Sequence, residues 1–470
     1  MTEEEQSAAF QQTLSTYYDE LKWLYNELYH NDEQAFSYFI SMLRVCYMRR
    51  DPSFVGRDRT DATDQTEISM LMYMDFDIQN MQKVGPQLDE ARACGIGSVY
   101  LLSAKGDPTA FIRACHERDM RVGVAFSVAP ADYRNPTLFN DMLADILRLC
   151  GCGADLLHCR PLPPFHPLVR MMRMALEIVC PGVVLVGETE GGLPETMSWF
   201  GTADKPECHV ISNIALMEDI WHTVATRDVR LLRQQIELVS QQATRGCLLN
   251  FLRNHRVIRW SLDYDHLRQF SVQEDAHRRF LNDYFSGAWP GSTARGRLVE
   301  LPGGGAGIMG TTSDLCGITA AEEAGDVQAL DSAIRLDIML HAIIFTLGGV
   351  PALCSDDYNR LNAGRIRQKG DWVERLFDTT RGLGEIRSSH RAFERGADVW
   401  TLETWNDHVL GIGRYCRGEK LLALFNFGDN DEIAWIDEAE PYTDLRTDAF
   451  REAKAVSLPA HDFAWLMTTF

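Results

Sequence analysis

The sequence predicts an α/β fold, a (β/α)8 TIM barrel with an N-terminal helical segment and a C-terminal antiparallel β-sandwich. Three observations favour it: two amphipathic helical patterns open the chain, apolar runs alternate with helical patterns through its middle, and short β-branched or aromatic runs close it. Alternating strands and helices are typical of a parallel sheet, and eight such units are typical of a closed barrel. We therefore expect three regions, an N-terminal helical domain with linker over 1–61, the barrel over 62–395 and the sandwich over 396–470.

The N-terminal region is predicted to form two helices. Apolar side chains recur every three or four residues from Leu14 to Leu28 and again from Phe36 to Tyr47, which is the spacing of one helix face. The polar sequence HNDEQ separates the two patterns, and the polar stretch 51–65 suits a linker.

Eight apolar runs are predicted to be the barrel strands. In chain order they are ISMLMYM (68–74), SVYLLS (98–103), RVGVAFSV (121–128), ADLLHC (154–159), VVLVGE (183–188), HVISN (209–213), CLLNFL (247–252) and VPALCS (350–355). The active site of such a barrel lies at the carboxyl ends of its strands. We therefore expect the functional side chains just after these runs.

Five later runs predict the β-sandwich. They are VWTLETW (399–405), HVLGIGRY (408–415), KLLALFNF (420–427), EIAWI (432–436) and FAWLMTTF (463–470). Gly, Asp and Asn turns separate them, as in antiparallel sheets.

Composition narrows the classes of partner. The 46 Lys and Arg against 67 Asp and Glu give a net charge of -21, which argues against nucleic acid as a partner. The first residues, MTEEEQSAAF, lack the features of a signal peptide, and no apolar run is long enough to span a bilayer. We expect a cytoplasmic protein without a membrane partner.

Cofactor and metal motifs are not predicted. The twelve cysteines are scattered through apolar stretches and are expected to be free thiols, and the spacing of Cys150, Cys152 and Cys159 matches no common zinc pattern. The glycine run Leu301–Ser313 lacks the Gly-Lys-Ser/Thr ending of a phosphate-binding loop and is predicted to be a flexible surface loop.

Three stretches resemble glycoside hydrolase family 13, the α-amylase superfamily. GADLLHCRPL (153–162), LNFLRNHRVIRW (249–260) and GGVPALCSDD (348–357) are similar, in this order, to its fourth-, seventh- and eighth-strand motifs. YMDFD (73–77), ISNIALMEDIWHTVATRDVRLL (211–232), PGSTARG (290–296) and the N-terminal helices narrow the resemblance to amylosucrases. The resemblance implies the three-domain order above. The domain that this subfamily inserts after strand 3 is missing, because only one helical stretch, 132–149, stands there.

The resemblance also implies where catalytic carboxylates would stand. Retaining glycosidases need a nucleophilic carboxylate and an acid/base carboxyl group, and this family adds a third carboxylate. The acid/base position is Glu188, but the nucleophile position is Arg160 and the third position is Arg256. A guanidinium is always protonated and cannot attack an anomeric carbon.

Substrate-binding positions are partly retained in the same comparison. Asp75, His255 and Arg365 match binding positions of the family, and His158 stands where an arginine is usual. On the third strand the ring-binding aspartate and histidine are replaced by Ala125 and Pro130.

Three hypotheses follow. The first is a pseudoenzyme that has lost retaining chemistry and binds carbohydrate, with Glu188 in an ion pair with one or both arginines, which would favour its ionised form. The second is a weakly active α-glucoside hydrolase or glucosyltransferase, acting on sucrose or α-glucans, that recruits Asp155, Asp356 or Asp357. The third makes Arg160, Arg256, His158 and His255 a site for a sugar phosphate or sugar acid. The sequence does not predict the oligomeric state.

Overall fold

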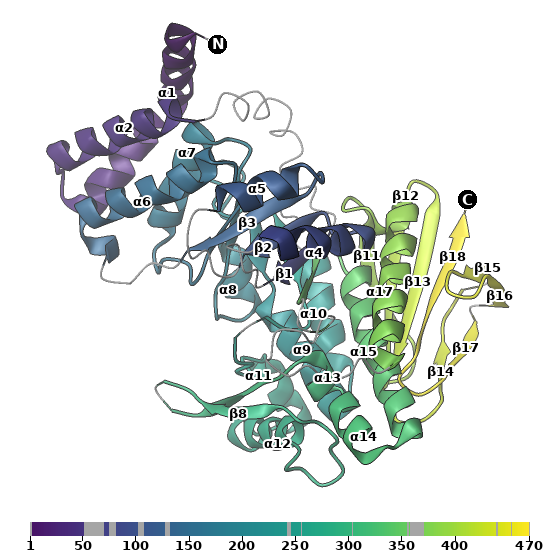
Figure 1. The fold of residues 1–470 in the computed structure, drawn as a ribbon. Helices are drawn as coiled ribbons and strands as arrows, with labels where there is room; N and C mark the ends of the chain where they lie inside the picture. The colour runs from purple at the N-terminus through teal and green to yellow at the C-terminus, as the bar shows by residue number, and fades with distance from the viewer. Residues whose placement is uncertain are drawn as a thin grey trace.

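Two N-terminal helices open the chain, as predicted (Figure 1). The computed structural model describes residues 2–50, 70–74, 81–101, 108–126, 132–241, 246–254, 256–302, 304–354, 357, 371–438, 440–452 and 454–469. Helix α1 (Glu3–Tyr29) starts earlier than its apolar pattern because Thr2 and Glu5 form a capping box. Helix α2 (Glu33–Met48) starts at the N-cap Asp32. The predicted linker 51–65 lies outside the described residues.

The N-terminal helices pack on the barrel through one hydrophobic cluster. Phe10, Leu21 and Phe39 are buried in it together with side chains of α6 (Pro136–Gly151) and α7 (His166–Val179). A bidentate ion pair, Arg170 to Glu20 at 2.9 and 2.8 Å, joins α7 to α1. Figure 1 shows α1 and α2 beside α6 and α7 at one side of the molecule.

All eight predicted barrel strands are confirmed. They are β1 (Leu71–Met74), β2 (Ser98–Leu101), β3 (Arg121–Phe126), β4 (Leu156–Cys159), β5 (Val184–Gly187), β6 (Val210–Ser212), β7 (Cys247–Asn250) and β10 (Val350–Cys354). They close a parallel barrel in the order β1-β10-β7-β6-β5-β4-β3-β2. Every residue of β2, β4, β5 and β7 is buried, as expected for strands that are covered on both sides.

Helices surround this barrel. They include α4 (Met81–Ala93), α5 (Thr109–His116), α6, α7, α8 (Leu193–Ser198), α9 (Ile214–Thr226), α10 (Arg230–Ser240), α15 (Val327–Thr346) and α17 (Asp371–Ser389). A 3-10 turn (η1, Asp132–Arg134) and α6 are the only described elements between β3 and β4. This agrees with the absence of an inserted domain there.

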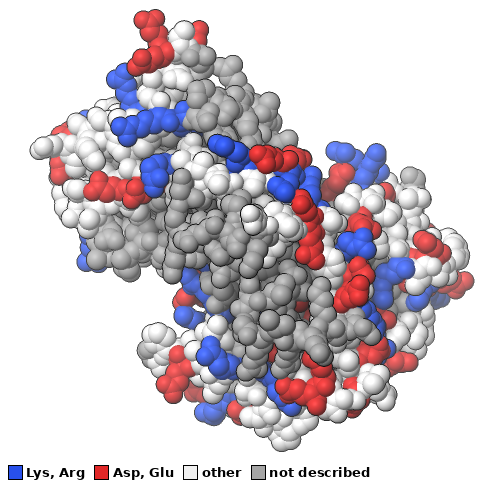
Figure 2. All heavy atoms as spheres, in the orientation of Figure 1, with Lys and Arg blue, Asp and Glu red and all other residues white. Residues whose placement is uncertain are grey.

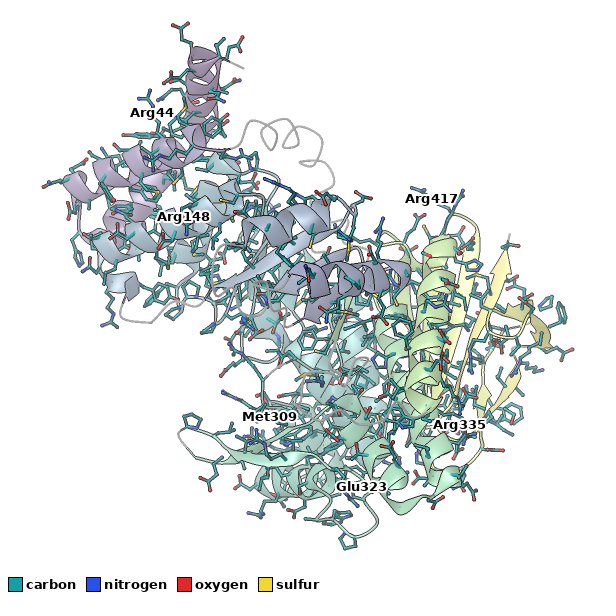
Figure 3. All side chains as sticks on the ribbon, in the orientation of Figure 1. Arg44, Arg148, Met309, Glu323, Arg335 and Arg417 are labelled. Carbon is teal, nitrogen blue, oxygen red and sulfur yellow. The ribbon has the colours of Figure 1, made fainter. Side chains whose placement is uncertain are left out.

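A long excursion between β7 and β10 corrects one prediction. It contains α11 (Tyr264–Leu267), η2 (Arg268–Phe270), α12 (Glu274–Ser286), the hairpin β8 (Arg297–Glu300) and β9 (Ala306–Met309), α13 (Thr312–Leu315) and α14 (Ile318–Ala324). The glycine run predicted as a flexible loop therefore contains a strand and the start of a helix. Glycine is required at Gly307 because an added Cβ would lie 2.2 Å from the carbonyl oxygen of Ile258. The hairpin projects from the body, and Met309 marks the end of β9 (Figures 1 and 3).

The C-terminal region is the predicted antiparallel β-structure. Its six-stranded sheet has the order β11 (Asp398–Leu402), β12 (Val409–Cys416), β13 (Glu419–Asn426), β18 (Phe463–Thr469), β15 (Pro441–Asp444) and β16 (Ala449–Glu452), and β14 (Glu432–Trp435) pairs with β17 (Ala455–Leu458). Leu422, Leu424 and Leu466 of the larger sheet pack against Ala434 and Val456 of the pair. The sequence did not predict β15 and β17, in which two of four residues are exposed, or β16, in which three of four are exposed.

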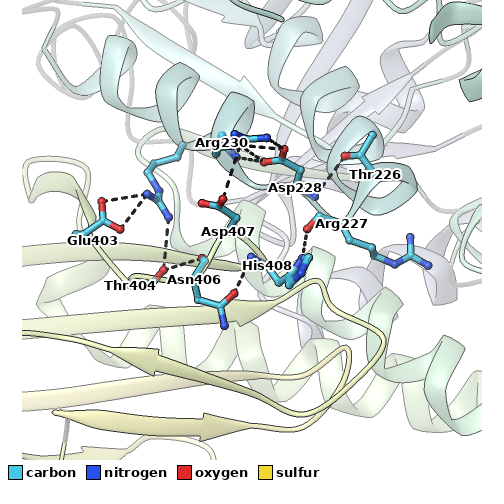
Figure 4. Close-up of polar contacts among 10 residues, drawn as sticks. Thr226, Arg227, Asp228, Arg230, Glu403, Thr404, Asn406, Asp407 and His408 are labelled. Carbon is cyan, nitrogen blue, oxygen red and sulfur yellow. Dashed lines mark hydrogen bonds and ion pairs between the residues drawn. The ribbon is translucent and has the colours of Figure 1, made fainter. Parts of the chain in front are cut away.

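The other face of this sheet packs on the barrel. Trp465 is fully buried, and its indole N–H donates to Oγ1 of Thr346 at 2.9 Å. Polar contacts continue along the edge, where Nδ1 of His408 lies 2.7 Å from the carbonyl oxygen of Arg227. The loop that joins β11 to β12 contains His408. Figure 4 shows this loop between the sheet and the α9–α10 connection, with Asp407 facing Arg230. The boundaries at residues 61 and 395 remain predictions.

The cysteines, the apolar helices and the surface charges describe the remaining general features of the chain. All twelve cysteines are free, and nine are buried. None of the helices in the described ranges is both long and apolar enough to cross a membrane. Acidic and basic side chains are interspersed on the face drawn in Figure 2, so the net charge of -21 is not gathered on one described patch there.

Candidate functional site

Glu188 stands at the carboxyl end of a barrel strand. It follows Gly187, the last residue of β5, its backbone N–H donates to Cys159 of β4 at 3.2 Å, and its carbonyl oxygen accepts from the N–H of Leu162 at 2.9 Å. Only 1% of the residue is exposed. The backbone of two strands thus fixes a buried carboxylate at the face where barrel enzymes place their chemistry.

Arg256 forms an ion pair with this carboxylate. Its Nε lies 2.8 Å from Oε1 of Glu188, while its own backbone N–H donates to Oδ1 of the buried Asn254 at 2.9 Å. The Arg256 side chain is 28% exposed and therefore reaches from the buried carboxylate to the surface. The ion pair expected between Glu188 and an arginine is confirmed for Arg256.

His158 lies on the other side of Glu188, inside the barrel. Its Nε2 is 3.6 Å from Oε2 of Glu188 and 3.4 Å from Oγ of Ser212 on β6. The edge of the His158 ring meets Tyr100 of β2 at 5.0 Å between centroids. His158 therefore belongs to the buried polar interior beneath Glu188.

Arg160 occupies the matching place on the neighbouring strand. It follows Cys159, which pairs with Gly187 in register, so Arg160 and Glu188 leave adjacent strands at the same level. The Arg160 N–H donates to Phe126 of β3 at 3.1 Å, and its guanidinium lies over the Tyr100 ring at 5.9 Å. The structure thus brings together Glu188, Arg160, Arg256 and His158.

Burial and charge act in opposite directions on Glu188. Burial raises the pKa of its carboxyl group above the ordinary value, and the charges of Arg256 and Arg160 offset only part of the rise. The sequence-based expectation that the arginines favour the ionised form was therefore incomplete. The desolvation penalty of a nearly inaccessible carboxylate outweighs them.

A second carboxylate extends the ion pairs to the surface. Oε1 of Glu190 lies 3.2 Å from NH1 of Arg256, and its Oε2 lies 2.5 Å from NH1 of Arg259. Glu190 is 47% exposed and Arg259 is 39% exposed. Sequence reasoning missed both, although Glu190 follows Glu188 by two residues and Arg259 follows Arg256 by three.

Glu218 holds the loop that carries these arginines. This residue of α9 is buried, and its carboxylate accepts the backbone N–H groups of Arg259 at 2.9 Å, of Trp260 at 3.1 Å and of Ser261. Burial raises the pKa of Glu218, and the three N–H donors offset part of that rise. The sequence signal for such a role was the pair of adjacent acids, Glu218 and Asp219, in the mostly apolar sequence of α9.

Two of the carboxylates considered as replacements lie in other environments. Asp155 precedes β4, at the opposite end of the strand from Arg160, and its Oδ2 accepts from Val122 N–H at 2.8 Å. Asp357 is buried, and its Oδ1 lies 2.7 Å from Nε of Arg253.

The remaining predicted residues are not all described. Ala125 lies on β3 beside His158 in register. Asp75, His255, Arg365, Asp356 and Pro130 lie outside the described residues.

Solved structures of two α-amylases and a debranching enzyme have a similar fold. The chain is similar to an α-amylase from Anoxybacillus (TM-score 0.59, 12% identity, 85% of this chain and 97% of that one). It is also similar to the α-amylase of Geobacillus thermoleovorans in complex with acarbose (0.59, 13%, 86% and 98%) and to a debranching enzyme from Nostoc punctiforme (0.57, 15%, 86% and 99%). The chain shares the fold of these enzymes, which confirms the predicted resemblance to α-amylases at the level of the fold.

The curated relatives match a shorter segment. A glucosylglycerate phosphorylase from Spirochaeta thermophila is 26% identical over 138 residues, which cover 26% of this chain and 23% of the relative. Another from Allomeiothermus silvanus is 27% identical over 138 residues, with 26% and 25% covered. The matches span about a quarter of these relatives' length. No protein-family model matches the chain.

Proposed function

We propose that this chain is a pseudoenzyme on the α-amylase fold, which has lost retaining glycosidase chemistry and serves to bind carbohydrate. The observation that carries the proposal is the pair formed by Glu188 and Arg256 at 2.8 Å. The acid/base position is thus neutralised by the residue that stands at the third carboxylate position. The closer likeness to amylosucrases is part of this proposal.

Retaining hydrolysis needs one group that attacks the sugar and one that donates a proton. A retaining mechanism begins with attack by a carboxylate, and Arg160, at the nucleophile position, offers none. Glu188 has a raised pKa, which suits an acid, but an acid without a nucleophile completes no double displacement. The surviving carboxyl group is better explained as a partner of Arg256.

Turnover assays test the proposal. Purified protein is incubated with sucrose, with an aryl α-glucoside and with an aryl α-glucoside plus inorganic phosphate, and sugar release is compared with that from Glu188→Gln. We expect no difference between the two proteins. Turnover that Glu188→Gln abolishes would overturn the proposal.

The alternative of a weakly active enzyme has less support. The distance between catalytic carboxyl groups in glycosidases is about 5 to 10 Å across an open cleft. Asp155 lies at the opposite end of its strand, and the Asp357 carboxylate is 4% exposed and paired with Arg253. Asp155 therefore lies at the other end of the barrel from Glu188. Asp357 follows the carboxyl end of β10, but its carboxylate is occupied by Arg253.

A second candidate function is recognition of an anionic sugar. The observation that favours it is the number of arginines at the carboxyl ends of the barrel strands, since Arg160 and Arg256 stand at the predicted carboxylate positions and Arg259 shares Glu190 with Arg256. Guanidinium groups suit phosphates and carboxylates. The curated relatives are named for a glucoside of glycerate and for phosphorolysis, which is consistent with an anionic ligand.

Thermal-shift screening separates the two candidates. The probes are glucose, glucose phosphates and uronic acids in low salt. We expect the anionic sugars to raise the melting temperature more than glucose does. Equal shifts with all sugars would leave the pseudoenzyme proposal standing and remove the anion proposal. The absence of any shift would remove both the anion proposal and the carbohydrate-binding part of the pseudoenzyme proposal.

A further inference from the structure

We infer that Arg256 and Arg259 form a clamp for the carboxylate or phosphate group of a sugar-derived ligand, and that the Glu190 carboxylate is the built-in occupant which this ligand displaces. The inference rests on the second candidate function, recognition of an anionic sugar. To that candidate function the inference adds the residues that form the clamp, a competing carboxylate within the chain and the residues that hold the clamp in place.

The geometry of Glu190 is that of a bridging anion. One of its oxygens lies 3.2 Å from Arg256 and the other lies 2.5 Å from Arg259. A single carboxylate therefore spans two guanidinium groups that would otherwise repel each other. A carboxylate or phosphate on a ligand offers the same spacing of oxygen atoms and the same charge.

The clamp is held in place independently of Glu190. Asn254 accepts the backbone N–H of Arg256, and Glu218 accepts those of Arg259, Trp260 and Ser261. Both acceptors are buried. The two arginines therefore stay close when Glu190 leaves, which lowers the entropic cost of binding a ligand.

The two carboxylates on Arg256 differ in how easily they can be replaced. Glu188 is 1% exposed and fixed by strand hydrogen bonds, whereas Glu190 is 47% exposed. Exposed ion pairs contribute little stability and exchange with solvent ions. Glu188 thus anchors Arg256, and Glu190 is the exchangeable anion.

Isothermal titration calorimetry in low salt tests this inference, with glucuronate, glycerate and inorganic phosphate as probes and glucose as the neutral control. Glu190→Gln removes the competitor, so we expect its affinity for the anions to rise about three- to thirtyfold, the range for losing two exposed ion pairs. Arg259→Gln in the Glu190→Gln background should reverse the gain. The matched control is Glu403→Gln, which removes an exposed carboxylate from Arg233 at 3.2 Å in another part of the chain.

Three outcomes are distinct. Tighter anion binding in Glu190→Gln, unchanged glucose binding and no effect of Glu403→Gln support the clamp. Unchanged or weaker anion binding in a folded Glu190→Gln protein overturns the clamp. If the wild-type protein nevertheless binds the anions, the candidate function stands, and the anions bind at another site. Equal gains in Glu190→Gln and Glu403→Gln overturn the clamp as well, because they reflect net charge alone. Circular dichroism and melting temperature verify that each variant is folded.

Discussion

Nε of Arg256 lies 2.8 Å from Oε1 of Glu188, so the carboxylate that follows β5 is paired with a cation from the segment after β7. The carboxylate is almost inaccessible, while the arginine is 28% exposed. Burying a carboxylate is costly unless a partner compensates it. The contribution of this ion pair to stability can therefore be measured.

Removing Arg256 alone should destabilise the protein more than removing both partners of this ion pair. We expect Arg256→Gln to lower the free energy of unfolding by about 1–3 kcal/mol, below the usual 3–5 kcal/mol for a buried pair because Arg256 is partly exposed. Glu188→Gln should cost less, since it removes the buried charge. A double-mutant cycle in urea measures the coupling, and simple additivity would contradict the ion pair's contribution.

The ion pair of Asp357 and Arg253 should be structural. Asp357 is buried and also accepts the N–H of Thr312 at 3.0 Å. We expect Asp357→Asn to cost about 2–4 kcal/mol, because it leaves a nearly buried guanidinium with weaker compensation. The control is Asp265→Asn, whose carboxylate is 87% exposed beside Arg268. Urea unfolding compares the two, and equal costs would refute the assignment.

The ion pair of Glu20 and Arg170 should hold the first helix on the barrel. The pair is bidentate, the Arg170 side chain is 8% exposed, and its hydrogen bond lowers the pKa of Glu20. We expect Glu20→Gln to cost about 1 kcal/mol and to speed hydrogen exchange in α1 without changing exchange in the barrel strands. Lys22→Gln, which breaks an exposed pair with Glu33 at 3.3 Å, is the control and should change neither.

Two neighbouring histidines should make the fold sensitive to acid. Burial lowers the pKa of His222 to about 3, with His277 adding to the effect, and burial lowers that of His277 to about 4. In the unfolded chain each histidine binds a proton near pH 6.5. The contribution of the two neutral histidines to the stability of the fold is therefore complete above that pH and is lost as the pH falls.

Urea unfolding at pH 7 and pH 5 measures this loss. Each histidine that stays neutral only in the folded state costs about 1.4 kcal/mol per pH unit, so we expect the pair to account for about 2–4 kcal/mol between these pH values. The free energy of unfolding of the variant His222→Gln/His277→Gln should fall correspondingly less between pH 7 and pH 5. A variant whose stability falls as steeply as that of wild type would show that other groups cause the acid sensitivity.

Local patterns in the sequence were sufficient to predict much of the architecture. The apolar runs that became β1 to β7 and β10 are short, continuous and separated by helical periodicity, so neighbouring residues alone carried the signal. β16 (Ala449–Glu452) was missed because three of its four residues are exposed and its pattern is weak, so only its pairing with the preceding strand β15 identifies it as a strand. The strand β9 was missed for a similar reason, since a glycine-rich segment becomes a strand only when it pairs with β8.

For the candidate site, the sequence alone determined which residue types stand at the ends of the strands, including arginine at positions 160 and 256 and glutamate at position 188. Only the tertiary structure decided which charges meet. Glu190, Arg259 and Glu218 come from three separate segments, and their distances depend on how the loops after β5 and β7 and helix α9 pack together. The balance between burial and ion pairing at Glu188 was likewise undecidable from sequence, because desolvation is a property of everything that surrounds the carboxylate and not of the residue itself.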